Sequence, residues 1–155
     1  MTTTAVTTPE PTAPAAGART LALAHYAARG VLEHVLARHD LTFPQQVALR
    51  AAVTAEAAQT PEDLVAEVHG SLKADPGDVR ATVDELLAKG LLVTQGPHIR
   101  PTEAGRTLMA TVSAETGPVT ARVWGGISAA DLAATGRVLA VVTERANAEL
   151  AALNA

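Results

Sequence analysis

Three residues near the start of the chain have side chains that could do chemistry together. His25 and Arg29 are four residues apart and share a face of any helix that contains them, and Tyr26 adjoins them. A histidine and a tyrosine that face a cleft could support general acid–base chemistry on a bound molecule. The alternative is structural: His25 would lie on the apolar side of its helix against another helix, and Arg29 would be solvated.

The histidines do not have the spacing of a metal site within one chain. His25 and His39 are 14 residues apart, which is about 21 Å along a helix. His34 and His39 are turned about 140° from one another on the same helix. The absence of cysteine excludes thiol nucleophiles, disulfides and thiolate zinc sites. Because hydrolase, P-loop and dinucleotide motifs are also missing, we expect no metal, no cofactor and no catalytic residue, although enzyme activity stays open.

The composition narrows the class of protein further. The 155 residues have a formal net charge of −4 and are 48% hydrophobic but only 2% aromatic. So few rings cannot form a stacking platform for single-stranded nucleic acid, and the acidity argues against a strongly basic nucleic-acid-binding protein. Residues 1–17, rich in Thr, Ala and Pro, are expected to be a disordered tail rather than an export signal. No apolar stretch is long enough to span a bilayer, so we expect a cytoplasmic protein with no membrane partner.

Capping residues divide the rest of the chain into helices. They are predicted over residues 18–39, 43–53, 62–69, 76–89 and 102–112, and from 129 to near the end. Thr42 and Thr60 each begin a capping box with proline in the first turn of the helix. Gly70 and Gly90 are expected to end their helices, and the helix from 102 is expected to weaken near 117–118.

The last predicted helix, with Ser128 as its N-cap, has one apolar stripe over six turns. The stripe consists of Leu132, Thr135, Leu139, Val142, Ala146, Leu150 and Leu153. A second copy of the chain is the natural partner for this stripe, although packing on the first helix would also bury it. The pattern therefore predicts a homodimer.

A short β-hairpin is predicted between the fourth and fifth helices. Residues 91–93 and 98–100 form its strands, and residues 95–97 form the turn. Two helices joined by a tight turn and followed by a hairpin are the plan of a winged helix-turn-helix. The predicted fold class is therefore mainly α, a winged helix-turn-helix with a helical dimerisation domain and a short wing.

The order of these segments resembles the MarR family of bacterial regulators over roughly residues 18–153. The segments that carry the resemblance are LTFPQQVAL at 41–49, LVAE at 64–67, Val79, Val83 and Leu86, KGLL at 89–92, PTEAGR at 101–106 and ISAADL at 127–132. The most specific is PTEAGR, which is similar to the family's Leu-Thr-Glu-Ala-Gly-Arg after the wing. The resemblance divides the chain into dimerisation helices at 18–56 and 107–155 and a winged helix-turn-helix lobe at 57–106.

The resemblance implies a homodimer that reads double-stranded DNA and responds to a small molecule. DNA contact would come from Lys73, Arg80, His98 and Arg100. The effector, phenolic or anionic, would bind in a cleft between the dimerisation helices and the winged lobe, near His25, Tyr26, Arg29 and Trp124.

The charges of the predicted lobe support a second hypothesis. Residues 60–106 contain five basic and eight acidic residues, whereas affinity for duplex DNA comes largely from cations. The wing tip carries neither an acid nor an arginine, and Asp78 and Ala81 stand on the predicted recognition helix. The alternative is therefore a MarR-fold protein that no longer reads DNA and instead binds or chemically transforms a small metabolite. In this case Arg80 would be a solvated partner of Asp84, four residues on.

Overall fold

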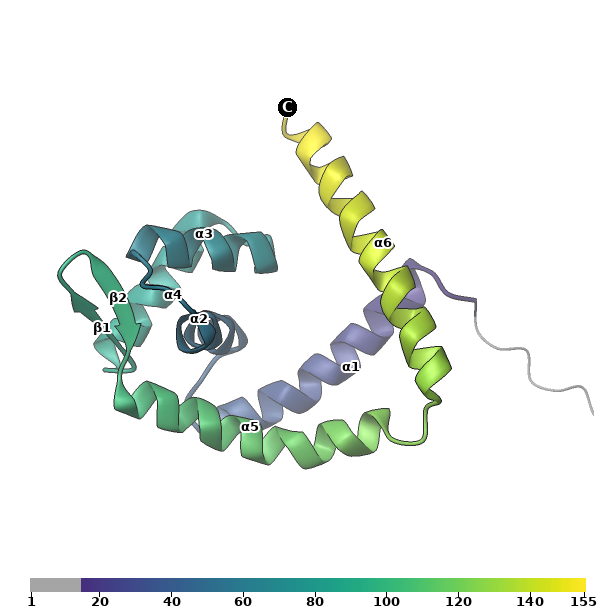
Figure 1. Ribbon diagram of the computed structural model, residues 1–155, viewed down its shortest axis with the longest axis horizontal. Helices are drawn as coiled ribbons and strands as arrows, with labels where there is room; N and C mark the ends of the chain where they lie inside the picture. Colours follow the sequence, from purple (N-terminus) through teal and green to yellow (C-terminus); the bar gives the residue numbers. More distant parts are fainter. Residues whose placement is uncertain (1–14) are drawn as a thin grey trace, which may run out of the picture. The chain divides into compact units, whose positions relative to one another are not determined.

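The computed structural model describes residues 15–155, and this part of the chain forms six helices and one two-stranded sheet (Figure 1). The elements are α1 (Ala18–Ala37), α2 (Phe43–Thr54), α3 (Pro61–Leu72), α4 (Pro76–Ala88), β1 (Leu92–Gln95), β2 (His98–Pro101), α5 (Glu103–Trp124) and α6 (Ala129–Leu153). The predicted order of helices and hairpin is confirmed. Most of the predicted disordered tail lies outside the described residues.

The predicted helix starts are confirmed because each depends on bonds within a few residues. The Thr42 hydroxyl accepts a hydrogen bond from the Gln45 N–H at 3.3 Å, and the Gln45 side chain accepts one from the Thr42 N–H at 3.1 Å. Thr60 and Asp63 form the same box, with distances of 3.1 and 3.0 Å. These bonds satisfy amide groups at the starts of α2 and α3 that would otherwise have no partner in the helix.

Two helices run further than predicted. Gly70 does not end α3, which continues to Leu72 and ends at Lys73 in the left-handed region at φ 54°. A single helical glycine costs only about 1 kcal/mol, and buried Val68 and half-buried Leu72 hold this turn on the core. Helix α5 passes through Pro118 to Trp124. Gly117 precedes this proline, and without a Cβ it relieves the usual clash with the proline ring.

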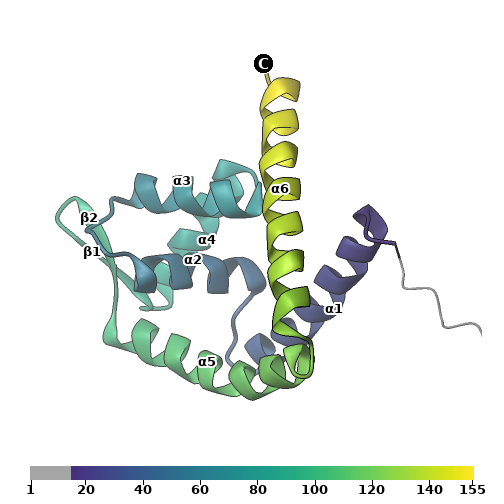
Figure 2. The same ribbon diagram turned by 45° about the vertical axis from the view of Figure 1, so that its right-hand side comes forward.

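The chain divides into two compact units, one ending at Glu115 and the other beginning at Thr116. In the first unit α2 packs against α3, α4 and β2, and α3 packs against α4 (Figure 2). The fully buried side chains at the centre are those of Leu36, Leu49, Leu64, Leu86, Leu92, Val68 and Val112. Helix α2 is the middle of this core, so its residues from Gln45 to Leu49 are all buried.

The hairpin is attached to this core through its second strand. Strand β1 pairs antiparallel with β2, so that Val93 lies opposite Arg100 and Gln95 opposite His98. On its other edge β2 forms a bridge to the loop before α3, where the Ile99 N–H donates to the Gln59 carbonyl at 2.9 Å. The turn uses Gly96 at φ 60°, a conformation that favours glycine. The wing base is therefore fixed to the loop between α2 and α3.

The second unit leaves its apolar side chains uncovered. None of the residues of α6 is buried. Leu139 is 38% exposed, Val142 43%, Leu150 40% and Leu153 82%. The predicted stripe is thus an open surface in the single chain.

Candidate functional site

Helix α4 has one face in the core and one in solvent, as a DNA-reading helix must. Val79, Val83 and Leu86 are buried. The opposite face exposes Gly77, Asp78, Arg80, Ala81 and Asp84. The Asp75 side chain caps the helix by accepting from the Gly77 N–H at 2.7 Å. The start of α4 is thereby held at the surface of the lobe, with Arg80 one turn further on.

Arg80 pairs with a different acid from the one that the sequence suggested. Its Nη1 lies 3.7 Å from Glu62 Oε1 on α3, and not beside Asp84. Both side chains are more than half exposed, and such a pair contributes at most about 1 kcal/mol to stability. Glu62 therefore does not prevent the Arg80 guanidinium from reaching another partner.

The other residues predicted to contact DNA differ in exposure. Lys73 is exposed in the turn between α3 and α4, and Arg100 is exposed on β2. His98 is only partly exposed, and its Nδ1 is buried with no hydrogen-bond partner in residues 15–155. The structure brings Lys73 and Arg80 to the same helix-turn-helix and leaves Arg100 and His98 on the wing.

Asp63 is the one titratable group of residues 15–155 with a clear pKa shift. Hydrogen bonds from the Thr60 backbone and side chain lower the pKa of Asp63 below its ordinary value of 3.8, and the charge of nearby His98 adds to this. The capping box thus keeps Asp63 ionised at the start of α3. This negative charge stands beside the wing histidine.

Lys89 has a structural role that the sequence did not reveal. Its ammonium contacts the Asp40 backbone carbonyl and lies 3.1 Å from Asp40 Oδ2 and 3.4 Å from Gln45 Oε1. The Gln45 side chain also donates to Glu85 at 2.7 Å. Asp40 and Lys89 are 49 residues apart in the chain, so no local pattern pointed to this contact. The network joins the turn before α2 to the end of α4 and leaves Lys89 less available to DNA than Arg80.

Three of the four predicted effector residues lie together on α1. The rings of His25 and Tyr26 meet edge to face with centroids 5.8 Å apart. Arg29 Nε bonds to Glu33 at 2.8 Å, and its guanidinium lies 4.5 Å from the Phe43 ring centroid. His25 and Tyr26 are both exposed. Trp124, the fourth residue, belongs to the second unit and is 51% exposed.

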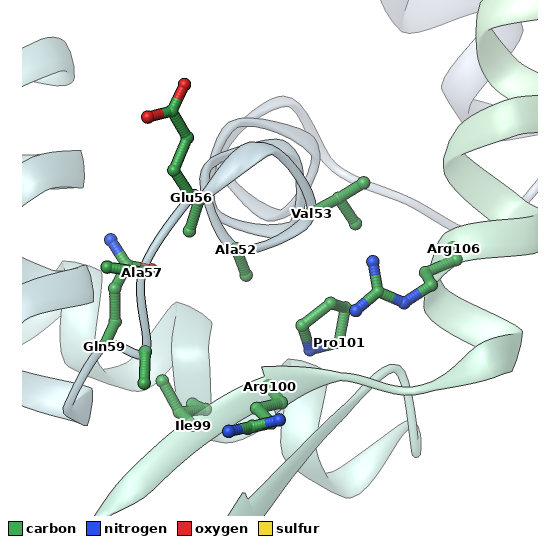
Figure 3. A pocket seen from close by; sticks show the side chains of 11 residues that line it. Ala52, Val53, Glu56, Ala57, Gln59, Ile99, Arg100, Pro101 and Arg106 are labelled. Atoms are coloured by element: carbon green, nitrogen blue, oxygen red, sulfur yellow. The ribbon is translucent and has the colours of Figure 1, made fainter.

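A cavity of about 230 Å³ lies elsewhere in the first unit (Figure 3). Its walls are the end of α2, the loop that follows, strand β2 and the start of α5. The lining residues include Ala52, Val53, Glu56, Gln59, Ile99, Arg100, Pro101 and Arg106. None of the four predicted effector residues lines it. Sequence reasoning named Arg106 only as part of a motif, because its position beside residues 52–59 depends on the packing of α5.

No group of three or more His, Asp and Glu side chains in residues 15–155 is placed to hold a metal ion. His39 instead pairs with Glu115 at 3.0 Å, where Arg38 also binds the same carboxylate at 2.6 Å. These two contacts fasten the end of α1 to α5 within the first unit. His39 is therefore a packing residue in this structure.

Comparison with known proteins gives a fold rather than a sequence family. No family model matches the sequence, and no curated protein sequence matches it either. Among solved structures, the transcriptional regulator PA3341 superposes with a TM-score of 0.70 at 21% identity, covering 83% of this chain and 96% of that one. CouR from Rhodococcus jostii RHA1, bound to p-coumaroyl-CoA, gives 0.67 at 21% identity, covering 80% and 88%. The Mycobacterium tuberculosis MarR family protein Rv2887, in complex with DNA, gives 0.61 at 21% identity, covering 83% and 98%.

The chain has the MarR fold. The mainly α winged helix-turn-helix predicted from the sequence is confirmed, and so is the resemblance that led to it at the level of architecture. Within residues 15–155, no single helix is long and apolar enough to cross a membrane. Only α5 and α6 taken together across the break between them pass that test, and it considers length and composition alone.

Proposed function

We propose that the chain is a MarR-type transcriptional regulator that acts as a homodimer, binds double-stranded DNA and responds to a small molecule. One observation carries this proposal. The MarR fold leaves the α4 face with Arg80 in solvent while its opposite face is in the core. A helix displayed in this way at the end of a helix-turn-helix fits the major groove of DNA. The solved MarR-fold structures support the proposal, since Rv2887 was obtained with DNA and CouR with an acyl-CoA.

The dimer is proposed from the exposed stripe of α6. Leu139, Val142 and Leu150 are each about two-fifths exposed in a helix with no buried residue. A contiguous apolar surface of this kind is typical of an interface. The first helix also exposes Leu21 at 43% and Val31 at 42%. We propose that residues 18–56 and 107–155 form the dimerisation part and that residues 57–106 form the DNA-binding lobe.

The DNA contacts are proposed to centre on Arg80. Its guanidinium can bind the O6 and N7 atoms of a guanine in the major groove, and each such pair contributes about 1–3 kcal/mol of discrimination. Exposed Lys73 and Arg100 would neutralise phosphates. His98 would act from the wing, although the buried position of its Nδ1 leaves less of the ring for contact. The effector is proposed to bind near His25, Tyr26 and Arg29 on α1, with Trp124 as an aromatic wall.

A salt titration of DNA binding tests this proposal. Fluorescence anisotropy with a labelled duplex from the region upstream of the chain's own gene should show specific binding that weakens as salt increases. Arg80→Ala should reduce the affinity by about 1–3 kcal/mol and relax the preference for that duplex. Arg137→Ala on α6 removes the same charge outside the lobe and should change neither quantity. Absence of specific binding by the wild type at low salt would refute the proposal.

The charge of the lobe favours one alternative function. Eight acidic against five basic residues in 60–106, with Arg80 next to Glu62, oppose binding to a polyanion. In this alternative the chain binds or transforms a small metabolite through the residues of α1. His25→Ala would then abolish ligand binding or turnover, while Arg80→Ala would have no effect.

A further inference from the structure

The cavity at the wing base combines two unpaired cations with an apolar lining. Arg100 extends from β2 and Arg106 from the first turns of α5 (Figure 3). Neither guanidinium has an ion pair or hydrogen bond to any residue of the described chain, 15–155. By contrast, Arg29, Arg38, Arg80 and Lys89 each have an acidic partner. The two cavity arginines are thus exceptions in a unit with many acids.

The remaining walls are short and mostly apolar. Ala52 and Val53 come from the last turns of α2, and Ile99 and Pro101 come from β2. Glu56 also belongs to the lining, but its carboxylate points away from the cavity in Figure 3, whereas the Arg106 side chain extends toward Pro101. Gln59 directs its amide to Glu67 at 2.6 Å. The charge that faces the cavity is therefore positive.

The size of the cavity limits what it can hold. A volume of about 230 Å³ corresponds to roughly eight water molecules at about 30 Å³ each. This is less than the range of about 300–1,000 Å³ for drug-sized ligands. A compound with one anionic group and a ring or a short branched chain has the right size. The apolar wall lowers the local dielectric, which strengthens the attraction between the guanidinium groups and an anion.

We propose that this cavity binds a small organic anion through Arg100 and Arg106. A carboxylate or phosphate group would lie against the guanidinium groups, whose planar N–H donors match its oxygens. The organic part would lie against the apolar wall formed by Ala52, Val53, Ile99 and Pro101. This site is distinct from the α1 residues proposed above for the effector, and its occupancy does not depend on whether the chain binds DNA.

Isothermal titration of the full-length chain with three probes tests the proposal. Benzoate supplies a carboxylate on a ring, inorganic phosphate supplies the anion alone, and benzamide is the neutral match of benzoate. We expect saturable binding of at least one of the two anions, with one molecule per chain, and no binding of benzamide. Saturation by benzoate assigns a carboxylate ligand and saturation by phosphate assigns a phosphorylated one. Either result upholds the anion site.

Variants assign the binding to the cavity. Arg100→Gln and Arg106→Gln should each weaken the bound anion at least about tenfold, as expected for the loss of a charged hydrogen bond. Arg106→Lys should keep part of the affinity, and Arg137→Gln, on α6, should keep all of it. Amide NMR shifts on adding the anion should include Gln59 and Ile99, which also makes the test independent of any effect of a variant on folding. Equal binding of benzamide, equal affinity in both glutamine variants, or no binding of either anion at millimolar concentration would overturn the proposal.

Discussion

Gly105 is the position at which a single methyl group should damage this fold most clearly. It is buried in the first turn of α5, inside the Pro101–Arg106 motif. A Cβ at this position would lie 2.2 Å from the Leu91 carbonyl oxygen and 3.2 Å from Leu49 Cδ1. The Leu91 oxygen cannot easily move aside, because it accepts hydrogen bonds from the Thr102 N–H at 3.0 Å and the Thr102 hydroxyl at 3.2 Å.

The expected cost of Gly105→Ala follows from these contacts. Overpacking in a core costs about 1–3 kcal/mol. Displacing a backbone carbonyl from its bonds costs about 1 kcal/mol for each bond that is lost. We therefore expect the free energy of unfolding to fall by about 3 kcal/mol, which is a large share of the roughly 5–15 kcal/mol that stabilises a typical domain. The melting temperature should fall by about 6–12 °C for a chain of this size.

Gly70→Ala is the matched control for this substitution. Gly70 is also helical, but a Cβ there meets nothing within 4 Å. Alanine in place of a helical glycine should stabilise the protein by about 0.5–1 kcal/mol. Urea unfolding followed by circular dichroism, at one fixed protein concentration, measures both variants. If Gly105→Ala unfolds within 1 kcal/mol of the wild type, the inferred contact with Leu91 is wrong.

Two further predictions concern the dimer and the α3 cap. Leu139→Glu should weaken self-association at least about tenfold, because a carboxylate would enter an apolar interface, whereas Ala148→Glu, roughly 180° away around α6, should not; sedimentation velocity over a concentration series measures this, and equal dissociation constants would argue against α6 as the interface. Asp63→Asn should lower stability at neutral pH, because the folded pKa of Asp63 lies below 3.8 and its ionised form is the one that the capping box stabilises. The difference in urea midpoint from the wild type should be present above pH 3.8 and shrink as the pH falls through the lowered pKa, and a difference that grows in acid would contradict the assignment.

The helix starts were predictable from the sequence because their determinants are local. Thr42 with Gln45, and Thr60 with Asp63, satisfy backbone groups three residues away, so a reader of the chain can locate them without knowing the fold. The hairpin turn at Gly96 is local in the same way. The α6 stripe was also legible, since helical periodicity alone determines which side chains share a face. The signals that are weak locally misled: Gly70 was expected to end α3, and packing of Val68 and Leu72 carried the helix past it.

Contacts between distant segments required the tertiary structure. The sequence offered Asp84 as the partner of Arg80, but the packing of α3 against α4 placed Glu62 beside it. Lys89 counted as a cation of the DNA-binding lobe until the fold joined it to Asp40. Arg106 stood unremarked in a motif until α5 placed it across a cavity from Ala52 and Val53. The sequence by itself determined where the helices begin and which faces are apolar, because hydrogen bonds and periodicity act over a few residues. Which charges are neutralised and which are left to face a ligand was decided only when elements some fifty residues apart came together.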